Sequence, residues 1–344
     1  MNTATNRRIV LAERPQGAPK SSDFSMISGP VPDLGEGEII SRTIYLSLDP
    51  YMRGRMNAGK SYAAPVEIGE TMCGGTVSQV LKSNNPEFSR DDYILTYDGW
   101  QEYAISDGKG ARKLDPTQAP ISTAVGVLGM PGMTAYMGLL EIGQPKSGET
   151  VVVAAATGAV GSNVGQIARL KGCRVVGIAG SSEKCEYARN ELGFDACINH
   201  KDGGFRESLK TACPEGIDVY FENVGGMVFE AIIPLLNFQS RIPVCGLIAH
   251  YNDTELPAGP NLLPKLMRTV LTQRVSIQGF IVSDFSNKQG AFLRDMSKWI
   301  AAGKIKYKED IVEGLDKAVG AFQGLLEGNN FGKLLVQVSE DPTR

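Results

Sequence analysis

The sequence predicts an α/β protein in which a six-stranded, doubly wound parallel sheet accompanies a smaller β-rich domain. In the middle of the chain, short β-branched runs alternate with segments of helical spacing. The first of these runs, Val151–Val153, ends in a glycine-rich turn. Residues up to about 120 lack this alternation and show short apolar segments between glycine and proline turns. Their predicted strands are Arg8–Ala12, Glu38–Leu48, Gly75–Leu81 and Tyr93–Tyr97.

The run at Val151–Val153 is apolar on both faces, which is typical of a strand inside a parallel sheet. It leads into Ala156-Thr157-Gly158-Ala159-Val160-Gly161, and a helical spacing then continues to Gly172. Glycines let backbone N–H groups approach a pyrophosphate, and a helix N-terminus adds partial positive charge. Because Ala156 replaces the first glycine of GxGxxG, a turn that only packs a helix against its strand is the alternative. A second strand follows directly at Arg174–Ala179 and favours a dinucleotide site.

The end of that second strand indicates which dinucleotide binds. NAD-binding proteins carry an acid about 20 residues after the glycine turn, where it binds the ribose 2′-hydroxyl. This chain has Gly180-Ser181-Ser182 there, with Lys184 just beyond. Hydroxyls and an ammonium can bind a 2′-phosphate. Lys184 as a solvated residue is the alternative, but the first turn of a helix favours acids. The sequence therefore predicts NADPH as the cofactor.

The alternation of strands and helices continues beyond this point. The further strands are predicted at Ala196–Asn199, Ile217–Phe221, Arg241–Cys245 and Val275–Val282. Helices are predicted at Ser182–Gly193, Phe205–Thr211, Met227–Leu236, Leu262–Leu271 and Gly290–Ala302. In such a sheet, ligands bind outside the carboxyl ends of the strands, so the loops that follow them are expected to form the site.

Composition excludes several classes of function. The hydrophobic content of 42%, the charged content of 21% and the net charge of −3 are ordinary for a globular protein, and no basic block suggests nucleic-acid binding. No apolar signal core or membrane-spanning run is present, so a cytoplasmic location without membrane association is expected. The six cysteines are scattered and are expected to be reduced thiols. Two histidines, His200 and His250, do not supply a zinc ligand set, so no metal site is predicted.

Several motifs together resemble those of the medium-chain dehydrogenase/reductase superfamily. The similarity is to its zinc-free branch of leukotriene B4 dehydrogenases, prostaglandin reductases and alkenal double-bond reductases, and within that branch most to the bacterial NADPH-dependent curcumin reductases. The segments that carry it are Leu46–Arg53, Met130–Tyr136, Ala155–Gly161, Ala179–Lys184, Glu222–Gly226, Cys245–Asn252 and Gly328–Lys333.

The resemblance implies a GroES-like barrel made from residues 1–125 and 306–344, with a Rossmann domain at 126–305. It also implies hydride transfer from NADPH to the β-carbon of an enone or enal, curcumin-like compounds included, and a homodimer, for which the edge strand Val275–Val282 is a plausible contact.

The same resemblance implies where NADPH lies. Gly158–Gly161 would hold the pyrophosphate, and Gly180, Ser181 and Lys184 would meet the 2′-phosphate. His200 stands where many relatives have a tyrosine near the adenosine, and a surface histidine is the alternative. Met130 and Thr134 would pack against the nicotinamide ring. The residues expected to line the ribose and nicotinamide are Asn223, Cys245, Gly246, Leu247, Ile248, Phe280, Ile281, Val282 and Asn330.

Tyr251 is the candidate catalytic residue. Hydride addition to an enone pushes charge onto the carbonyl oxygen, where one well-placed donor is worth about 3 kcal/mol. A phenol can donate while it stays neutral at pH 7. The alternative is an aromatic residue that stacks on the cofactor or closes its loop. Tyr51 and Tyr62 are expected to line the substrate cleft with Tyr251, although either could simply be core. We expect the α-carbon to take its proton from solvent.

Three other functions agree with the same residues. Two are enzymatic, a quinone reductase and a metal-free secondary-alcohol dehydrogenase. The third is a non-catalytic, NADPH-binding sensor. Turnover of an enone, a quinone and a ketone would distinguish among them.

Overall fold

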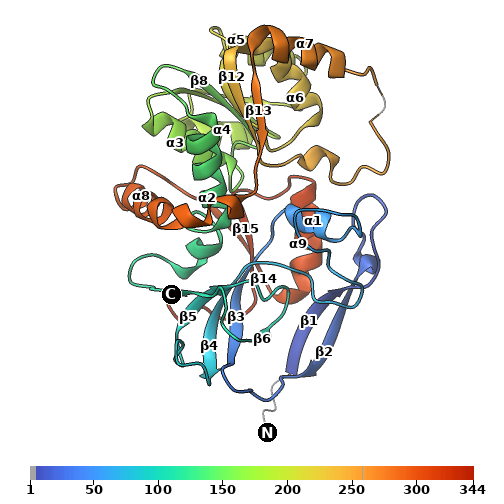
Figure 1. The fold of residues 1–344 in the computed structure, drawn as a ribbon, viewed down its shortest axis with the longest axis vertical. Coiled ribbons are helices and arrows are strands. Elements are labelled where there is room, and N and C mark those ends of the chain that lie inside the picture. Colours follow the sequence, from blue (N-terminus) through green and yellow to red (C-terminus); the bar gives the residue numbers. More distant parts are fainter. Residues whose placement is uncertain (1–4, 258) are drawn as a thin grey trace. The chain divides into compact units, whose positions relative to one another are not determined.

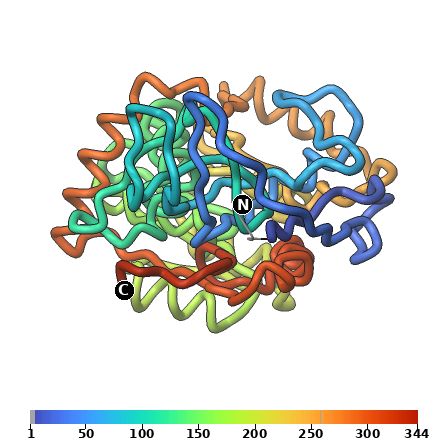
Figure 2. The backbone as a smooth tube through the Cα atoms, turned by 90° about the horizontal axis from the view of Figure 1, so that it is seen from below, coloured from blue at the N-terminus to red at the C-terminus, as the bar shows by residue number. Residues whose placement is uncertain are grey.

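The computed structural model describes residues 5–257 and 259–344 and divides the chain into two compact units. The first unit contains the described residues up to Gly126 together with Glu309–Asn330 and Leu334–Arg344. The second contains Val127–Lys308 and Phe331–Lys333. Figure 2 traces this course, with the C-terminal segments in red. Both ends of the chain therefore contribute to the first unit.

The second unit is built on a six-stranded parallel sheet. Its spatial order is β10 (Ala196–Asn199), β9 (Arg174–Ala179), β8 (Thr150–Ala154), β11 (Ile217–Phe221), β12 (Leu236–Val244) and β13 (Ser276–Gly279). The chain moves outward from β8 through β9 to β10, and then returns to β11 on the other side of β8. This reversal places the switch point between β8 and β11, where doubly wound sheets bind ligands. The predicted doubly wound parallel sheet is confirmed.

Helices cover both faces of this sheet. On one face, α5 and α6 pack against the buried side chains of Val152, Val176 and Tyr220. On the other, α3 packs against β8 and β9, and α2 packs against α3. The helices of this unit are α2 (Met130–Met137), α3 (Gly161–Leu170), α4 (Ser182–Asn190), α5 (Phe205–Ala212), α6 (Gly226–Ile232), α7 (Leu263–Gln273) and α8 (Gln289–Ala301), with the π-helical turn η3 (Gly138–Gly143) after α2.

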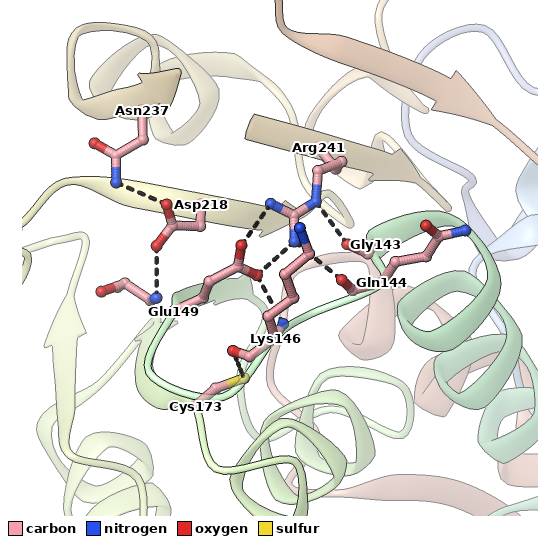
Figure 3. Close-up of polar contacts among 9 residues, drawn as sticks. Gly143, Gln144, Lys146, Glu149, Cys173, Asp218, Asn237 and Arg241 are labelled. Atoms are coloured by element: carbon pink, nitrogen blue, oxygen red, sulfur yellow. Dashed lines mark hydrogen bonds and ion pairs between the residues drawn. The ribbon is translucent and has the colours of Figure 1, made fainter. Parts of the chain in front are cut away.

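A polar network joins three strands near the amino end of β8 (Figure 3). The guanidinium of Arg241 in β12 donates to Glu149 Oε1 at 3.0 Å and to the Gly143 carbonyl at 2.9 Å. Asp218 in β11 accepts from the backbone N–H of Thr150 at 2.8 Å. Burial alone would raise the pKa of Glu149, but the hydrogen bonds from Arg241 and from the Lys146 backbone outweigh it and lower that pKa. The network stabilises the amino-terminal ends of these strands, opposite the loops that follow their carboxyl ends.

The first unit is β-rich. It contains the hairpin of β1 (Thr5–Leu11) and β2 (Phe24–Pro30) and a sheet ordered β14 (Glu309–Glu313), β15 (Lys333–Gln337), β3 (Ile39–Ser47), β4 (Thr76–Ser83), β5 (Tyr93–Thr96) and β7 (Arg112–Leu114), with β6 (Tyr103–Ser106) also on β3. The pairing of β15 with β3 is antiparallel, so that a C-terminal strand and an N-terminal strand lie side by side in one sheet (Figure 1). In the core of this unit the rings of Phe24, Trp100 and Phe322 pack together, and Phe322 comes from α9 (Ala318–Leu326). The same cluster includes Met52 of α1 (Tyr51–Arg55).

The structure corrects several predicted elements. The helix predicted at Met227–Leu236 ends at Ile232, because Pro234 initiates a short 3₁₀ turn and Leu236 already belongs to β12. The strand predicted at Val275–Val282 ends at Gly279, since Phe280 turns inward against Phe221. Among the elements of the first unit, β2, β6, β7, β14, α1 and α9 were not predicted.

Candidate active site

The turn after β8 brings the backbone very close to the start of α3. Ala155 adopts a φ of +52°, which is uncommon for a residue with a side chain. The Gly158 N–H donates to the Ala155 carbonyl at 2.9 Å. A Cβ atom at Gly161 would lie only 2.2 Å from that carbonyl oxygen, so only glycine fits there. This strand, tight turn and helix have the local geometry that suits a dinucleotide pyrophosphate.

The predicted phosphate residues meet at the end of β9. The hydroxyl of Ser181 caps α4 by accepting from the Lys184 N–H at 3.3 Å. An added Cβ at Gly180 would lie 3.4 Å from Nε2 of His200 and 3.9 Å from Nζ of Lys201, both from the end of β10. Burial and then the charge of Lys201 lower the pKa of His200. The neighbourhood of Gly180 is thus rich in hydrogen-bond donors, as a 2′-phosphate requires.

Lys201 is a site candidate that sequence reasoning missed. Its side chain approaches Gly180 from a neighbouring strand, so no spacing around Lys184 reveals it. The only sequence signal is its position directly after His200, at the carboxyl end of a predicted strand.

The loops that leave β11 and β12 are hydrogen-bonded to each other. The side-chain amide of Asn223 donates to the Ala154 carbonyl at 2.8 Å and so reaches the end of β8. The backbone N–H of Cys245 donates to the Glu222 carbonyl at 3.0 Å. The N–H of Ile248 donates to the Asn223 carbonyl at 3.3 Å. The structure therefore brings the predicted residues Asn223 and Cys245–Ile248 together at the switch point.

A buried carboxyl group, Glu222, shapes the first of these loops and is a second residue whose role the sequence did not reveal. Its Oε1 accepts from the backbone N–H groups of Val224 at 2.6 Å and Gly225 at 2.8 Å, and from the Tyr220 hydroxyl at 3.0 Å. Burial raises the pKa of Glu222 despite these bonds. The group holds the turn that presents Asn223.

A pocket of about 450 Å³ opens at the carboxyl ends of β12 and β13. The phenol oxygen of Tyr251 lies 3.4 Å from the backbone nitrogen of Leu247 on its rim. Burial, and then the nearby Glu222, raises the pKa of Cys245 to about 12, so its thiol is neutral and weakly polar. The lining residues are Val244, Cys245, Gly246, Leu247, Tyr251, Gly279, Phe280, Ile281 and Asp284.

The remaining predicted residues lie elsewhere in the two units. Thr134 is buried in α2, and its hydroxyl donates to the Met130 carbonyl at 2.8 Å. Val282 begins a short 3₁₀ helix that packs on α2. Tyr51, Tyr62 and Asn330 belong to the first unit, so their roles in binding stay predictions. There Tyr51 is partly buried, and Tyr62 is 59% exposed.

No group of three or more His, Cys, Asp or Glu residues that could hold a metal ion occurs in the parts of the chain that the structure describes. The two histidines follow β10 and β12, which are four strand spacings apart in the sheet. Four spacings of about 4.8 Å separate them by roughly 19 Å, too far to share one ion. Across residues 5–257 and 259–344, no helix has the length and hydropathy to span a membrane.

Known proteins resemble this chain over nearly its entire length. The family model described as the N-terminal domain of oxidoreductase matches residues 7–114, and the model described as zinc-binding dehydrogenase matches residues 159–300. The NADPH-dependent curcumin reductase of Escherichia coli is 56% identical over 98% of both chains. The 2-alkenal reductase (NADP(+)-dependent) of Nicotiana tabacum is 39% identical over 98% of both.

A solved structure, CurA from Vibrio vulnificus in complex with NADPH, superposes with a TM-score of 0.95 at 56% identity. It matches 97% of this chain and 100% of that one. The matches thus extend over nearly the entire length, and the chain belongs to the medium-chain dehydrogenase/reductase superfamily.

Proposed function

We propose that this protein uses NADPH to saturate the C=C bond of α,β-unsaturated carbonyl compounds, with curcumin-like enones among its substrates. The class of reaction and the cofactor are confirmed by the relatives, which are named as NADPH-dependent reductases and include an NADPH complex. The observation that carries the assignment in this chain is the pocket beside Tyr251. The pocket opens at the carboxyl ends of the strands, where the glycine turn after β8 and the donor-rich end of β9 also lie.

When bound, NADPH supplies the hydride. Gly158–Gly161 would hold its pyrophosphate through backbone N–H groups. Gly180, Ser181 and Lys184, joined by Lys201, would bind the 2′-phosphate, with His200 toward the adenosine. The ribose and nicotinamide would lie against Asn223, Cys245–Ile248 and Phe280–Val282, with Met130, Thr134 and Asn330 as further candidates.

Tyr251 would donate a hydrogen bond to the carbonyl oxygen of the substrate. That oxygen gains negative charge as the β-carbon is reduced, and a donor fixed beforehand stabilises the charge without reorganising. Most of the pocket lining is uncharged, with the neutral thiol of Cys245 beside the apolar Phe280 and Ile281, and its acidic residue, Asp284, offers no counter-charge to an anion. The pocket therefore suits an uncharged conjugated system. The α-carbon would then take its proton from solvent.

The experiment that tests this function follows NADPH consumption with three acceptors of similar size: an enone, a quinone and a simple ketone. We expect the enone to be turned over and its product to gain two hydrogen atoms by mass spectrometry. Preferential reduction of the quinone or the ketone would instead indicate the quinone reductase or the alcohol dehydrogenase. NADPH binding without turnover of any activated alkene would favour the non-catalytic sensor.

The reaction is proposed to need no zinc, in line with the separation of the two histidines. Metal analysis of active protein should find less than one zinc per active site, and a chelator should leave the rate unchanged. If the chelator abolished activity and added zinc restored it, this part of the proposal would be contradicted.

A homodimer is also proposed. The edge strand β13 is exposed at all four residues, with Ile277 42% exposed. Beside it in sequence, α7 leaves Leu263, Met267 and Leu271 exposed at a spacing of four residues, which forms one apolar stripe. Light scattering should give twice the chain mass. Leu271→Lys combined with Ile277→Lys should give monomers, whereas Leu170→Lys on α3 should not.

We propose a cytoplasmic location. All six cysteines are free thiols, which is the state that a reducing compartment maintains. Fractionation of cells that express the protein at natural levels should recover it with the cytoplasmic fraction.

A further inference from the structure

The side chain of His250 connects the two loops at the switch point. Its Nε2 accepts a hydrogen bond from the backbone N–H of Gly226 at 3.0 Å. Its Nδ1 lies 2.8 Å from Oδ2 of Asp253. The ring also packs closely on Gly225, where an added Cβ would lie 2.9 Å from Cδ2. The imidazole thus bridges the loop after β11 and the loop after β12.

These contacts determine the tautomer. A backbone N–H only donates, so Nε2 must be unprotonated to accept from Gly226. The single proton of the neutral ring is therefore on Nδ1, from which it is donated to the Asp253 carboxylate. Protonation of Nε2 would place two donors against each other and break the bond to Gly226, while the contact with Asp253 would remain.

The bond matters for Tyr251 because that residue is next in the chain. Four backbone bonds also join this loop to the loop after β11. Ala249 N–H donates to the Val224 carbonyl at 2.9 Å, Ile248 N–H to the Asn223 carbonyl at 3.3 Å, and the N–H groups of Cys245 and Gly246 to the Glu222 carbonyl. All four lie before His250, on the side away from Tyr251 in sequence. Among these contacts between the two loops, the one made by the His250 ring lies nearest to Tyr251 in sequence.

We propose that neutral His250, as its Nδ1–H tautomer, is a positioning residue that fixes Tyr251 over the pocket and that its imidazolium form releases it. The role in catalysis rests on the proposed function of Tyr251. The geometric part, the tautomer and its coupling to Gly226, does not depend on that function.

Other ionisable groups belong to the segments around His250. Asp253 is on the same loop and contacts the ring directly. Glu222, at the end of β11, is bonded to the backbone of the facing turn, and Glu230 in α6 is paired with Arg206. Tyr251, Cys245 and Glu255 are further ionisable residues of the loop that carries His250. Titration of Glu222 could also disturb the turn, so a Glu222→Gln variant is needed beside the His250 variants.

The first test is NMR of protein labelled with ¹⁵N-histidine, which has only two histidine spin systems. His250→Gln assigns them by the signal that it removes. We expect Nδ1–H with unprotonated Nε2 at neutral pH. On acidification, the Gly226 amide and the Tyr251 ring should shift with the same midpoint as His250, also in Glu222→Gln. An Nε2–H tautomer at neutral pH, or a Tyr251 ring indifferent to the titration, would overturn the proposal.

The second test is steady-state kinetics with the enone. His250→Ala should lower kcat about 10-fold with the KM for NADPH changed less than about twofold, since the chemistry loses a positioned donor. His250→Gln keeps an acceptor for the Gly226 N–H but does not titrate. This variant should retain most of kcat. Its kcat should not fall on acidification at the midpoint of His250, as the kcat of the wild type should.

Wild-type kcat in His250→Ala, or an unchanged acid limb in His250→Gln, would show that the backbone bonds alone position Tyr251. If the wild-type protein reduces no enone, the proposed function fails, and the NMR titration of the Tyr251 ring alone decides whether His250 positions it.

Discussion

The phenol oxygen of Tyr251 lies 3.4 Å from the backbone nitrogen of Leu247, four residues earlier on the loop that leaves β12. The same oxygen would be 3.1 Å from a Cβ atom added at Gly246. The loop therefore folds back on itself and brings the phenol to the wall of the pocket. A glycine at position 246 leaves room for that approach.

Tyr251→Phe removes the phenol and keeps the ring. We expect kcat for an enone to fall about 100-fold, because one preorganised donor at a developing oxyanion contributes about 3 kcal/mol. The dissociation constant of NADPH, measured by fluorescence titration, should change less than about twofold because the ring remains in place. An unchanged kcat would assign Tyr251 a packing role only.

Lys184→Ala tests how the 2′-phosphate is recognised. Loss of a charge-assisted hydrogen bond worth about 2 kcal/mol should weaken NADPH about 30-fold and leave NADH nearly unaffected. The matched control is Lys171→Ala, which removes an exposed lysine at the end of α3. Calorimetric titration with both nucleotides gives the comparison. Equal weakening of NADPH and NADH would show that Lys184 does not recognise the phosphate.

Cys245 should resist the electrophiles that the pocket is proposed to accept. With its pKa raised to about 12, only about one thiol in 10,000 is ionised at pH 8, and the thiolate is the form that adds to an enal. Peptide mapping after exposure to an enal should find Cys245 unmodified at pH 8, whereas unfolded protein should be alkylated readily. Fast modification of native Cys245 would contradict the raised pKa.

The ion pair between Arg241 and Glu149 should give a stability that depends on pH. Each side chain is 19% exposed, so Glu149→Gln should cost about 2 kcal/mol of unfolding free energy at pH 7. The pKa of Glu149 is lowered in the folded state. Its contribution is therefore complete above the usual glutamate pKa of about 4.3 and is lost as the pH falls through the lowered value.

Urea denaturation of both forms at pH 7 and pH 3 checks this prediction. The difference between wild type and Glu149→Gln should shrink at pH 3. Glu191→Gln is a suitable control, because the pair of Glu191 with Lys306 is more than half exposed on both sides. A difference for Glu149→Gln that grows in acid would be inconsistent with a lowered pKa.

The amino-acid sequence by itself determined the second unit well. The strands at Arg174–Ala179, Ala196–Asn199 and Ile217–Phe221 match β9, β10 and β11 in full, because each is a short, mostly apolar run bounded by turn residues. The glycine turn could also be predicted from the sequence, since the close approach of the backbone at Gly161 excludes any side chain. Local patterns of this kind depend only on neighbours in the chain.

Only the tertiary structure decided which loops meet. His250 reaches Gly226, and Lys201 reaches Gly180, because separate strands end side by side at one edge of the sheet. The strand order that produces these encounters is set by packing between distant segments. The same reason explains β13, whose end at Gly279 follows from Phe280 packing on Phe221. A hydrophobic pattern records that a residue is buried, but not the partner against which it is buried.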